Sequence, residues 1–256
     1  MMVPGKSLLA AGTTVGVVVA VWVGLTWNET VSDLFLPGPG EMWSAFLDMI
    51  ENGYKSRTLL EHISDSLTRV LVGFGTGAVI GTALGLAMGY LPVVDALCAP
   101  FIEFLRPLPQ LAYLVLLIIW LGIGETSKIT LLFLAALPIS AVAARDGVRN
   151  VAITRLQMAQ SLGANRWQIF RHVIFPSSLS EIFTGARLAI GAVYGTLIAA
   201  EIIAGTTGIG WLILDAGRFL RSDYVFVGIF MIGVMGIALD RILLTAERRI
   251  VHWAGR

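Results

Sequence analysis

The sequence predicts an all-α membrane protein with six transmembrane helices. The chain has 256 residues, of which 56% are hydrophobic and only 14% are charged, and its mean hydropathy is +0.81. A soluble domain normally carries about 25% charged residues, so this chain has too few to cover a surface exposed to water. The apolar residues form runs of helix length, and a helix satisfies its own backbone hydrogen bonds inside a bilayer.

The first apolar run covers residues 8–27 and contains no charged residue. A helix of about 20 residues is roughly 30 Å long, which is enough to cross the bilayer core. A cleaved signal peptide has a shorter apolar region of about 7–15 residues, followed by a small-residue cleavage site. We therefore expect a retained first span.

Residues 28–66 are acidic, with seven carboxylates against Lys55 and Arg57. A Pro-Gly turn at 36–40 precedes the stretch 41–50, in which apolar residues recur at helical spacing. This pattern predicts an interfacial helix along the outer face of the membrane. Residues 1–66 then form an N-terminal part, a first span plus this helix, and residues 67–256 form the core domain.

The second predicted span, 67–90, carries glycines at every fourth position. Such spacing places them near one face of a helix, where another helix backbone can approach closely. We expect this face to pack tightly against a second helix. The residues are Gly73, Gly77, Gly81, Gly85 and Gly89.

The third apolar unit, 97–122, is interrupted in its middle by Pro107 and Pro109. Glu103 and Arg106 precede the prolines and are three residues apart, so a helix would place them side by side. Ionisable residues at membrane depth often mark a transport pathway, whereas the same pair at the inner interface would act as an anchor. If this unit is re-entrant, the chain has five spans.

The remaining spans are expected at 129–144, 180–204 and 224–244, and the distribution of Lys and Arg sets their direction. With the N-terminus inside, the inner segments 1–7, 91–96, 145–180 and 241–256 hold one, zero, five and four basic residues. The acidic 28–66 segment then falls outside, in agreement with the positive-inside rule. We expect both termini to be cytoplasmic.

The longest inner segment, the coupling loop 145–180, carries five arginines and a helix–turn–helix pattern. A helical run at 156–162 is followed by a break at Gly163, and a second run at 166–175 is expected to stop at Pro176. A basic, structured loop between spans predicts a cytoplasmic docking surface.

Several kinds of catalytic chemistry have no signature in this sequence. It contains no G-x-x-x-x-G-K-[ST] loop, so we expect no ATP site of that kind in this chain. The three histidines are far apart, so we predict no metal site. We expect no enzyme activity and no nucleic-acid partner, but a pore in membrane lipid that is driven by a separate protein.

Within the coupling loop, the sequence resembles the E-A-A-x-x-x-G motif of ABC importer permeases, which continues after nine residues as I-x-L-P. Residues 157–159 stand for E-A-A, Gly163 stands for the glycine, and residues 173–176 stand for the last block, although Gln157 replaces the acid. Residues 104–109, 120–128 and 200–210 resemble the branch that contains taurine, aliphatic sulfonate, nitrate and bicarbonate permeases.

This resemblance implies a type I ABC importer permease fold in a bacterial inner membrane. It also implies a second permease copy, two cytoplasmic ATPase subunits that bind ATP and Mg²⁺, and a periplasmic or lipid-anchored substrate-binding protein. The short helix of the coupling loop would seat in the ATPase as a lever, or its apolar residues would only close the loop on itself. The residues expected at this contact are Leu156, Gln157, Met158, Ala159, Leu162, Gly163, Ala164, Trp167 and Pro176.

For the substrate, the resemblance favours taurine or another sulfonate, with nitrate, bicarbonate or another small solute as alternatives. Candidate pathway residues are Glu103, Arg106, Arg187 and Glu201, which could equally form structural ion pairs. A stand-alone secondary transporter is the rival class, and internal repeats with broken helices in both halves would indicate it.

Overall fold

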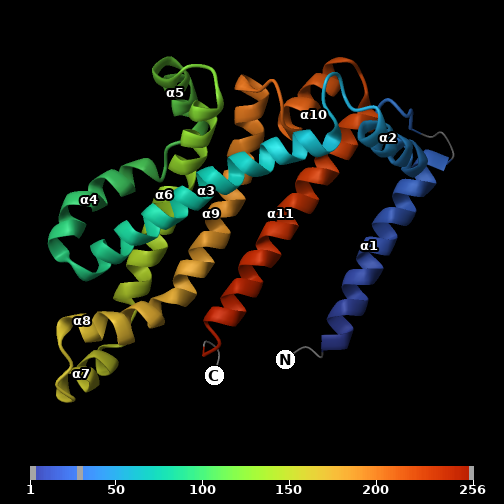
Figure 1. The fold of residues 1–256 in the computed structure, drawn as a ribbon. Coiled ribbons are helices and arrows are strands. Elements are labelled where there is room, and N and C mark those ends of the chain that lie inside the picture. Colours follow the sequence, from blue (N-terminus) through green and yellow to red (C-terminus); the bar gives the residue numbers. More distant parts are fainter. Residues whose placement is uncertain (1–3, 28–30, 254–256) are drawn as a thin grey trace.

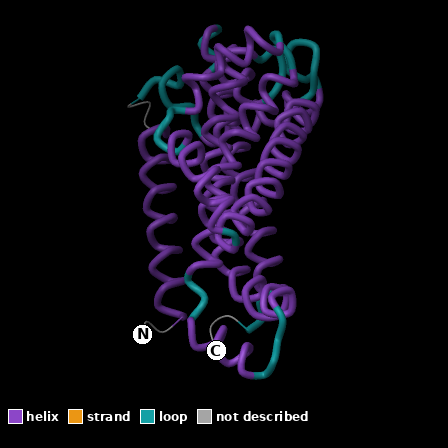
Figure 2. Tube along the Cα trace, turned by 90° about the vertical axis from the view of Figure 1, so that its left-hand side faces the viewer, coloured by secondary structure: helices purple, strands orange, loops and turns teal. Residues whose placement is uncertain are grey.

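A computed structural model describes the backbone of residues 4–27 and 31–253, with side chains from residue 12 onward in those ranges. Within these residues the fold is helical, with one isolated bridge between Tyr54 and Arg57. The ends of α1 and α11 nearest the two termini lie at the same end of the molecule as α7 (Figures 1 and 2). The helices are α1 (Pro4–Trp27), α2 (Pro39–Glu51), α3 (Leu59–Tyr90), α4 (Pro92–Leu105), η1 (Gln110–Tyr113), α5 (Leu114–Leu121), α6 (Glu125–Arg149), α7 (Ile153–Ser161), α8 (Arg166–Ile169), the π-helix η2 (Phe170–Ile174), α9 (Phe175–Ala204), α10 (Ile209–Arg218) and α11 (Ser222–Ile250).

Four described helical stretches are long and apolar enough to cross a membrane, namely α3, α6, the continuous stretch 166–204 and α11. The third apolar unit is broken as its prolines predict, because α4 and the η1–α5 helix meet at 96°. This pair makes a fifth span if it is counted as one. The remaining expected span, the first in the chain, is α1, which is 24 residues long and apolar over the part whose side chains are described, Gly12–Trp27.

The glycine face of α3 packs against α6, as the sequence predicts. A Cβ atom at Gly77 would lie 2.6 Å from the carbonyl oxygen of Phe133, and one at Gly81 would lie 2.5 Å from that of Leu137. By contrast, a Cβ at Gly75, on another face of α3, would meet nothing within 4 Å. The two helix backbones are therefore in direct contact along this face, which only glycine permits.

The predicted interfacial helix is α2, and it lies at the end of the molecule opposite the termini (Figure 1). It packs on α11 through buried Ala45 and Met49, whereas Trp43 is exposed. The indole nitrogen Nε1 of Trp22 donates to the carbonyl of Pro37, which ties α1 to the start of α2. An apolar cleft of about 710 Å³ lies between α1, α2 and α11.

The prediction that the second run of the coupling loop stops at Pro176 is wrong. Pro176 lies in the first turn of α9, and the helix continues from residue 166 to 204. Proline has no N–H to donate and normally interrupts a helix, but here the preceding turn is a π-helix, in which the N–H of Phe175 bonds to the carbonyl of Phe170. This wider turn accommodates the proline without ending the helix.

Candidate coupling surface and buried ion network

The turn between α7 and α8 is held by a complete set of backbone hydrogen bonds. The N–H of Ala164 bonds to the carbonyl of Ala159, and the N–H of Gly163 bonds to that of Gln160. This pattern is the Schellman motif, which requires a left-handed residue just after the helix. Gly163 has φ +79°, so the conformation of the turn accounts for the glycine of the motif.

The next helix begins with a capping box. The side chain of Asn165 accepts from the N–H of Gln168 at 2.9 Å, and the side chain of Gln168 accepts from the N–H of Asn165 at 2.8 Å. Both hydrogen bonds satisfy N–H groups that a helix start leaves unpaired. The break between α7 and α8 is thus a defined turn.

One face of the α7–α8 segment packs on the bundle. Leu156, Ala159 and Ala164 contact a buried cluster that includes Ile169 and Ile174. The hydroxyl of Tyr90, at the end of α3, donates to the carbonyl of Arg166 at 3.1 Å. The segment is therefore attached directly to the ends of the spanning helices, and Leu156 is an anchor to the bundle.

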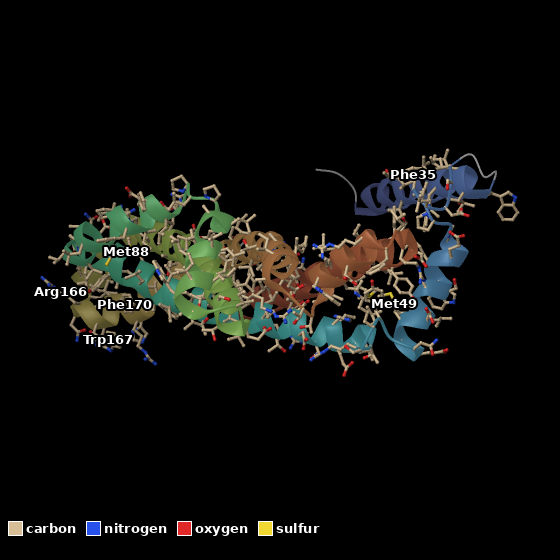
Figure 3. All side chains as sticks on the ribbon, turned by 90° about the horizontal axis from the view of Figure 1, so that it is seen from above. Phe35, Met49, Met88, Arg166, Trp167 and Phe170 are labelled. Carbon is tan, nitrogen blue, oxygen red and sulfur yellow. The ribbon has the colours of Figure 1, made fainter. Side chains whose placement is uncertain are left out.

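Elsewhere the α7–α8 segment exposes four large apolar side chains, which we call the coupling surface: Ile153, Met158, Leu162 and Trp167. Leu162 is 87% exposed and Trp167 is 65% exposed. Figure 3 shows Arg166, Trp167 and Phe170 gathered at one end of the molecule, with Met49 at the other. Large apolar side chains gathered on an exposed segment are typical of a protein interaction site.

The end of α6 that leads into α7 is clamped to α4 by charged residues. The carboxylate of Asp95 accepts from Nη2 of Arg145 at 2.9 Å and from Nη2 of Arg149 at 2.6 Å. Arg145 also contacts Glu103 at 3.4 Å. A displacement of α7 would therefore be transmitted to α4 as well as to α6.

A second charged group, the buried network, lies where α3, α6 and α9 meet away from the coupling surface. Arg69 on α3 bonds to Glu201 on α9 at 2.5 Å and to Glu125 on α6 at 2.5 Å. Lys128 bonds to Glu125 at 2.7 Å. Arg69 and Glu201 are almost fully buried, and ionised groups remain in such places only when they are paired and hydrogen-bonded.

The segment 205–210 closes this network with backbone groups. The N–H of Gly210 donates to Glu201, the N–H of Ile209 donates to Ser66, and the N–H of Gly208 donates to His62. Gly208 has φ +108°, and a Cβ there would collide with the Glu201 carboxylate and the Arg69 guanidinium. This geometry accounts for glycine at position 208.

The four candidate pathway residues have separate surroundings. Glu103 contacts Arg145 on α6 at 3.4 Å, and Arg106 follows directly after the last residue of α4, Leu105. Arg187 pairs with Asp240 on α11 at 2.8 Å. Glu201 belongs to the buried network, whose other charged members were not among the candidates.

Arg69 and Glu125 were not among the candidate residues. A sequence signal for Arg69 exists, because it lies near the start of an apolar span, where burying a charge is costly. Glu125 and Lys128 lie just before the expected span 129–144, whereas α6 already begins at Glu125. The sequence does not show that Arg69 meets Glu201, which is 132 positions further along the chain.

These features define a class of protein: a membrane-spanning helical bundle with exposed apolar side chains on the structured connection between α6 and α9. The description "Binding-protein-dependent transport system inner membrane component" belongs to the family whose sequence model matches residues 77–252. The chain belongs to this family. It is therefore a multi-pass ABC importer permease subunit of the taurine, sulfonate and nitrate branch.

Individual relatives agree with this assignment. The taurine transport system permease protein TauC of Escherichia coli is 41% identical over 94% of this chain and 88% of its own length. The putative aliphatic sulfonates transport permease protein SsuC of Bacillus subtilis is 31% identical over 93% of this chain and 84% of its own length. An inward-facing structure of the MetNI methionine ABC transporter matches with a TM-score of 0.62 at 20% identity, over 77% of this chain and 96% of the other, and supports the type I fold.

Proposed function

We propose that this chain is the pore subunit of an ATP-driven importer for a small anionic solute, first of all taurine or another sulfonate. The observation that carries the ATP-driven part is the coupling surface, where Leu162 and Trp167 are exposed next to a turn that backbone hydrogen bonds and the capping box at Asn165 hold in place. A rigid segment with exposed apolar side chains can bind a separate ATPase and transmit its motion to the spanning helices.

The working assembly in this proposal has two permease copies, two cytoplasmic ATPase subunits and an external substrate-binding protein. Both termini and the coupling surface face the cytoplasm, in keeping with the basic residues of segments 145–180 and 241–256. ATP and Mg²⁺ bind to the ATPase subunits, and this chain contributes the pore.

The proposed mechanism is alternating access. ATP binding closes the ATPase pair, moves both α7–α8 levers and turns the pore outward, and hydrolysis resets it. Shifting a two-state population from 1:99 to 99:1 requires about 5.5 kcal/mol of differential binding. The clamp of Asp95 on Arg145 and Arg149 provides a route by which lever motion reaches α4.

The substrate is proposed from the similarity to TauC and SsuC, whose names refer to taurine and aliphatic sulfonates. The test is uptake of radiolabelled taurine by vesicles that contain the permease, its ATPase and its binding protein, with ATP supplied at the ATPase side. We expect ATP-dependent uptake that ethanesulfonate reduces more than nitrate or bicarbonate does. Stronger competition by nitrate or bicarbonate would refute the sulfonate assignment, and uptake without ATP would favour a secondary transporter.

A further inference from the structure

Glu125 is the exposed member of an otherwise buried group of charges. Its side chain is 56% exposed, whereas the side chains of Arg69 and Lys128, which it bridges, are only 2% and 4% exposed. Its carboxylate accepts from Nε and Nη2 of Arg69 at 2.5 and 2.8 Å and from Nζ of Lys128 at 2.7 Å. Two buried cations thus share one exposed carboxylate.

Arg69 is held in place independently of Glu125. Its Nη1 donates to Glu201 at 2.5 Å and to the carbonyl of Thr207 at 3.0 Å, and its Nη2 also donates to the hydroxyl of Thr207 at 2.8 Å. Glu201 is fixed in turn by Ser66 and Gly210. If the Glu125 side chain swings outward, the Nε–Nη2 edge of Arg69 keeps its position and faces the space that the carboxylate has left.

The charges determine what can fill that space. The network contains two cations, Arg69 and Lys128, and two carboxylates, Glu125 and Glu201, so it is neutral only while Glu125 stays. For Lys128, Glu125 is the hydrogen-bond partner found within the described residues. Removing one partner of a buried ion pair is strongly unfavourable, so water alone is a poor replacement and an anion is required.

We propose that the Nε–Nη2 edge of Arg69 and the ammonium of Lys128 bind the sulfonate group of the transported solute, or a comparable oxyanion, and that Glu125 occupies this site until the solute displaces it. This inference rests on the function proposed above. A guanidinium edge binds two oxygens of an oxyanion in a fork. The third oxygen would accept from Lys128, and the hydroxyl of Thr207 has its own hydrogen left to donate.

The alternative is that Glu125 is a permanent bridge that only joins α3 to α6. The two readings differ in what happens when the Glu125 charge is removed. A permanent bridge leaves two uncompensated cations and a damaged protein that no solute repairs. A displaceable anion leaves an empty site that an added oxyanion fills.

The experiment uses the complete permease–ATPase complex in lipid nanodiscs, with ethanesulfonate as the probe. We expect Glu125→Gln to bind ethanesulfonate at least tenfold more tightly than wild type, because the internal competitor is gone, and its melting temperature to rise with ethanesulfonate concentration. In the double variant Glu125→Gln with Lys128→Met, the charges balance again and this response should disappear. Glu125→Asp keeps the charge on a side chain one methylene shorter and should lie between wild type and Glu125→Gln, which gives a second measurement if Glu125→Gln does not purify.

Asp95→Asn is the matched control, because it also removes a carboxylate that bridges two cations, at the other charged cluster. Ethanesulfonate should not stabilise it. Equal stabilisation of both variants would show non-specific binding of an anion, and no tightening in Glu125→Gln would show a permanent bridge; either result overturns the inference. Vanadate-sensitive ATPase activity of the same wild-type complex tests the proposed function separately, since it does not depend on this site.

Discussion

Gly77→Ala tests the close contact between α3 and α6. The added Cβ would lie 2.6 Å from the carbonyl oxygen of Phe133 and 2.8 Å from the Cβ of Ala136. Carbon and oxygen in such contacts normally stay about 3.3–3.6 Å apart, so the helices must separate locally by roughly 0.7–1.0 Å. Overpacking of this kind typically costs about 1–3 kcal/mol, and we expect the variant to be destabilised by this amount.

The assay is thermal unfolding of the purified protein in one fixed detergent, with Gly75→Ala as the control on the same helix. A Cβ at Gly75 meets nothing within 4 Å, so this variant should melt at or slightly above the wild-type temperature. In soluble domains of 150–250 residues, 1 kcal/mol shifts Tm by about 2–4 °C, which makes the difference measurable. Equal melting temperatures for the two variants would refute the backbone contact.

Three further predictions concern the coupling surface, the turn at Gly163 and the carboxylate of Asp215 on α10. Leu162→Ser should reduce co-purification of the ATPase while leaving permease stability within about 0.5 kcal/mol, because the side chain is 87% exposed. Gly163→Val should strain the left-handed turn at φ +79° and weaken coupling of ATP hydrolysis to uptake, whereas Gly163→Asn, which tolerates that conformation, should retain most of it. Burial tends to raise the pKa of Asp215, but hydrogen bonds from Lys55 and Tyr54 outweigh it and lower that pKa. The stability from Asp215 is therefore present above its unfolded pKa of about 3.9 and lost as pH falls through the folded value, so the Tm gap between wild type and Asp215→Asn should shrink below pH of about 4.

Each of these has a contradicting outcome. Ile123→Ser, a change at an exposed apolar residue near the start of α6, should leave ATPase co-purification unaffected; a loss equal to that of Leu162→Ser would count against a local docking surface. Equal coupling in Gly163→Val and Gly163→Asn would show that the turn geometry does not matter. A Tm gap for Asp215→Asn that grows in acid would reverse the sign of the linkage.

Local patterns in the sequence predict much of this fold. The glycine at every fourth position from Gly73 to Gly89 predicts a face for close helix packing, which the structure confirms, and the partner helix is α6. Gly163 predicts the break after α7, because the Schellman turn needs a left-handed residue. Both features depend on residues within a few positions of each other, which a sequence displays directly.

Contacts between distant residues could not be predicted in the same way. The spacing of Glu103 and Arg106 places them side by side on a helix, but it does not show that Glu103 contacts Arg145 on another helix. Arg69 meets Glu201 because α3 and α9 fold together, and no local pattern reports that. Pro176 predicts a helix end because proline interrupts ordinary α-helical hydrogen bonding. The π-helical turn before Pro176 has a different hydrogen-bond pattern, so the helix continues.

The most direct test of the central claim is co-purification of the tagged chain from native membranes, followed by mass spectrometry and an ATPase assay. We predict a P-loop ATPase in equal stoichiometry with the permease, vanadate-sensitive activity, and loss of the ATPase in Leu162→Ser. A chain that purifies alone, stable and without ATPase activity, would contradict the proposal that a separate motor drives this pore through the coupling surface.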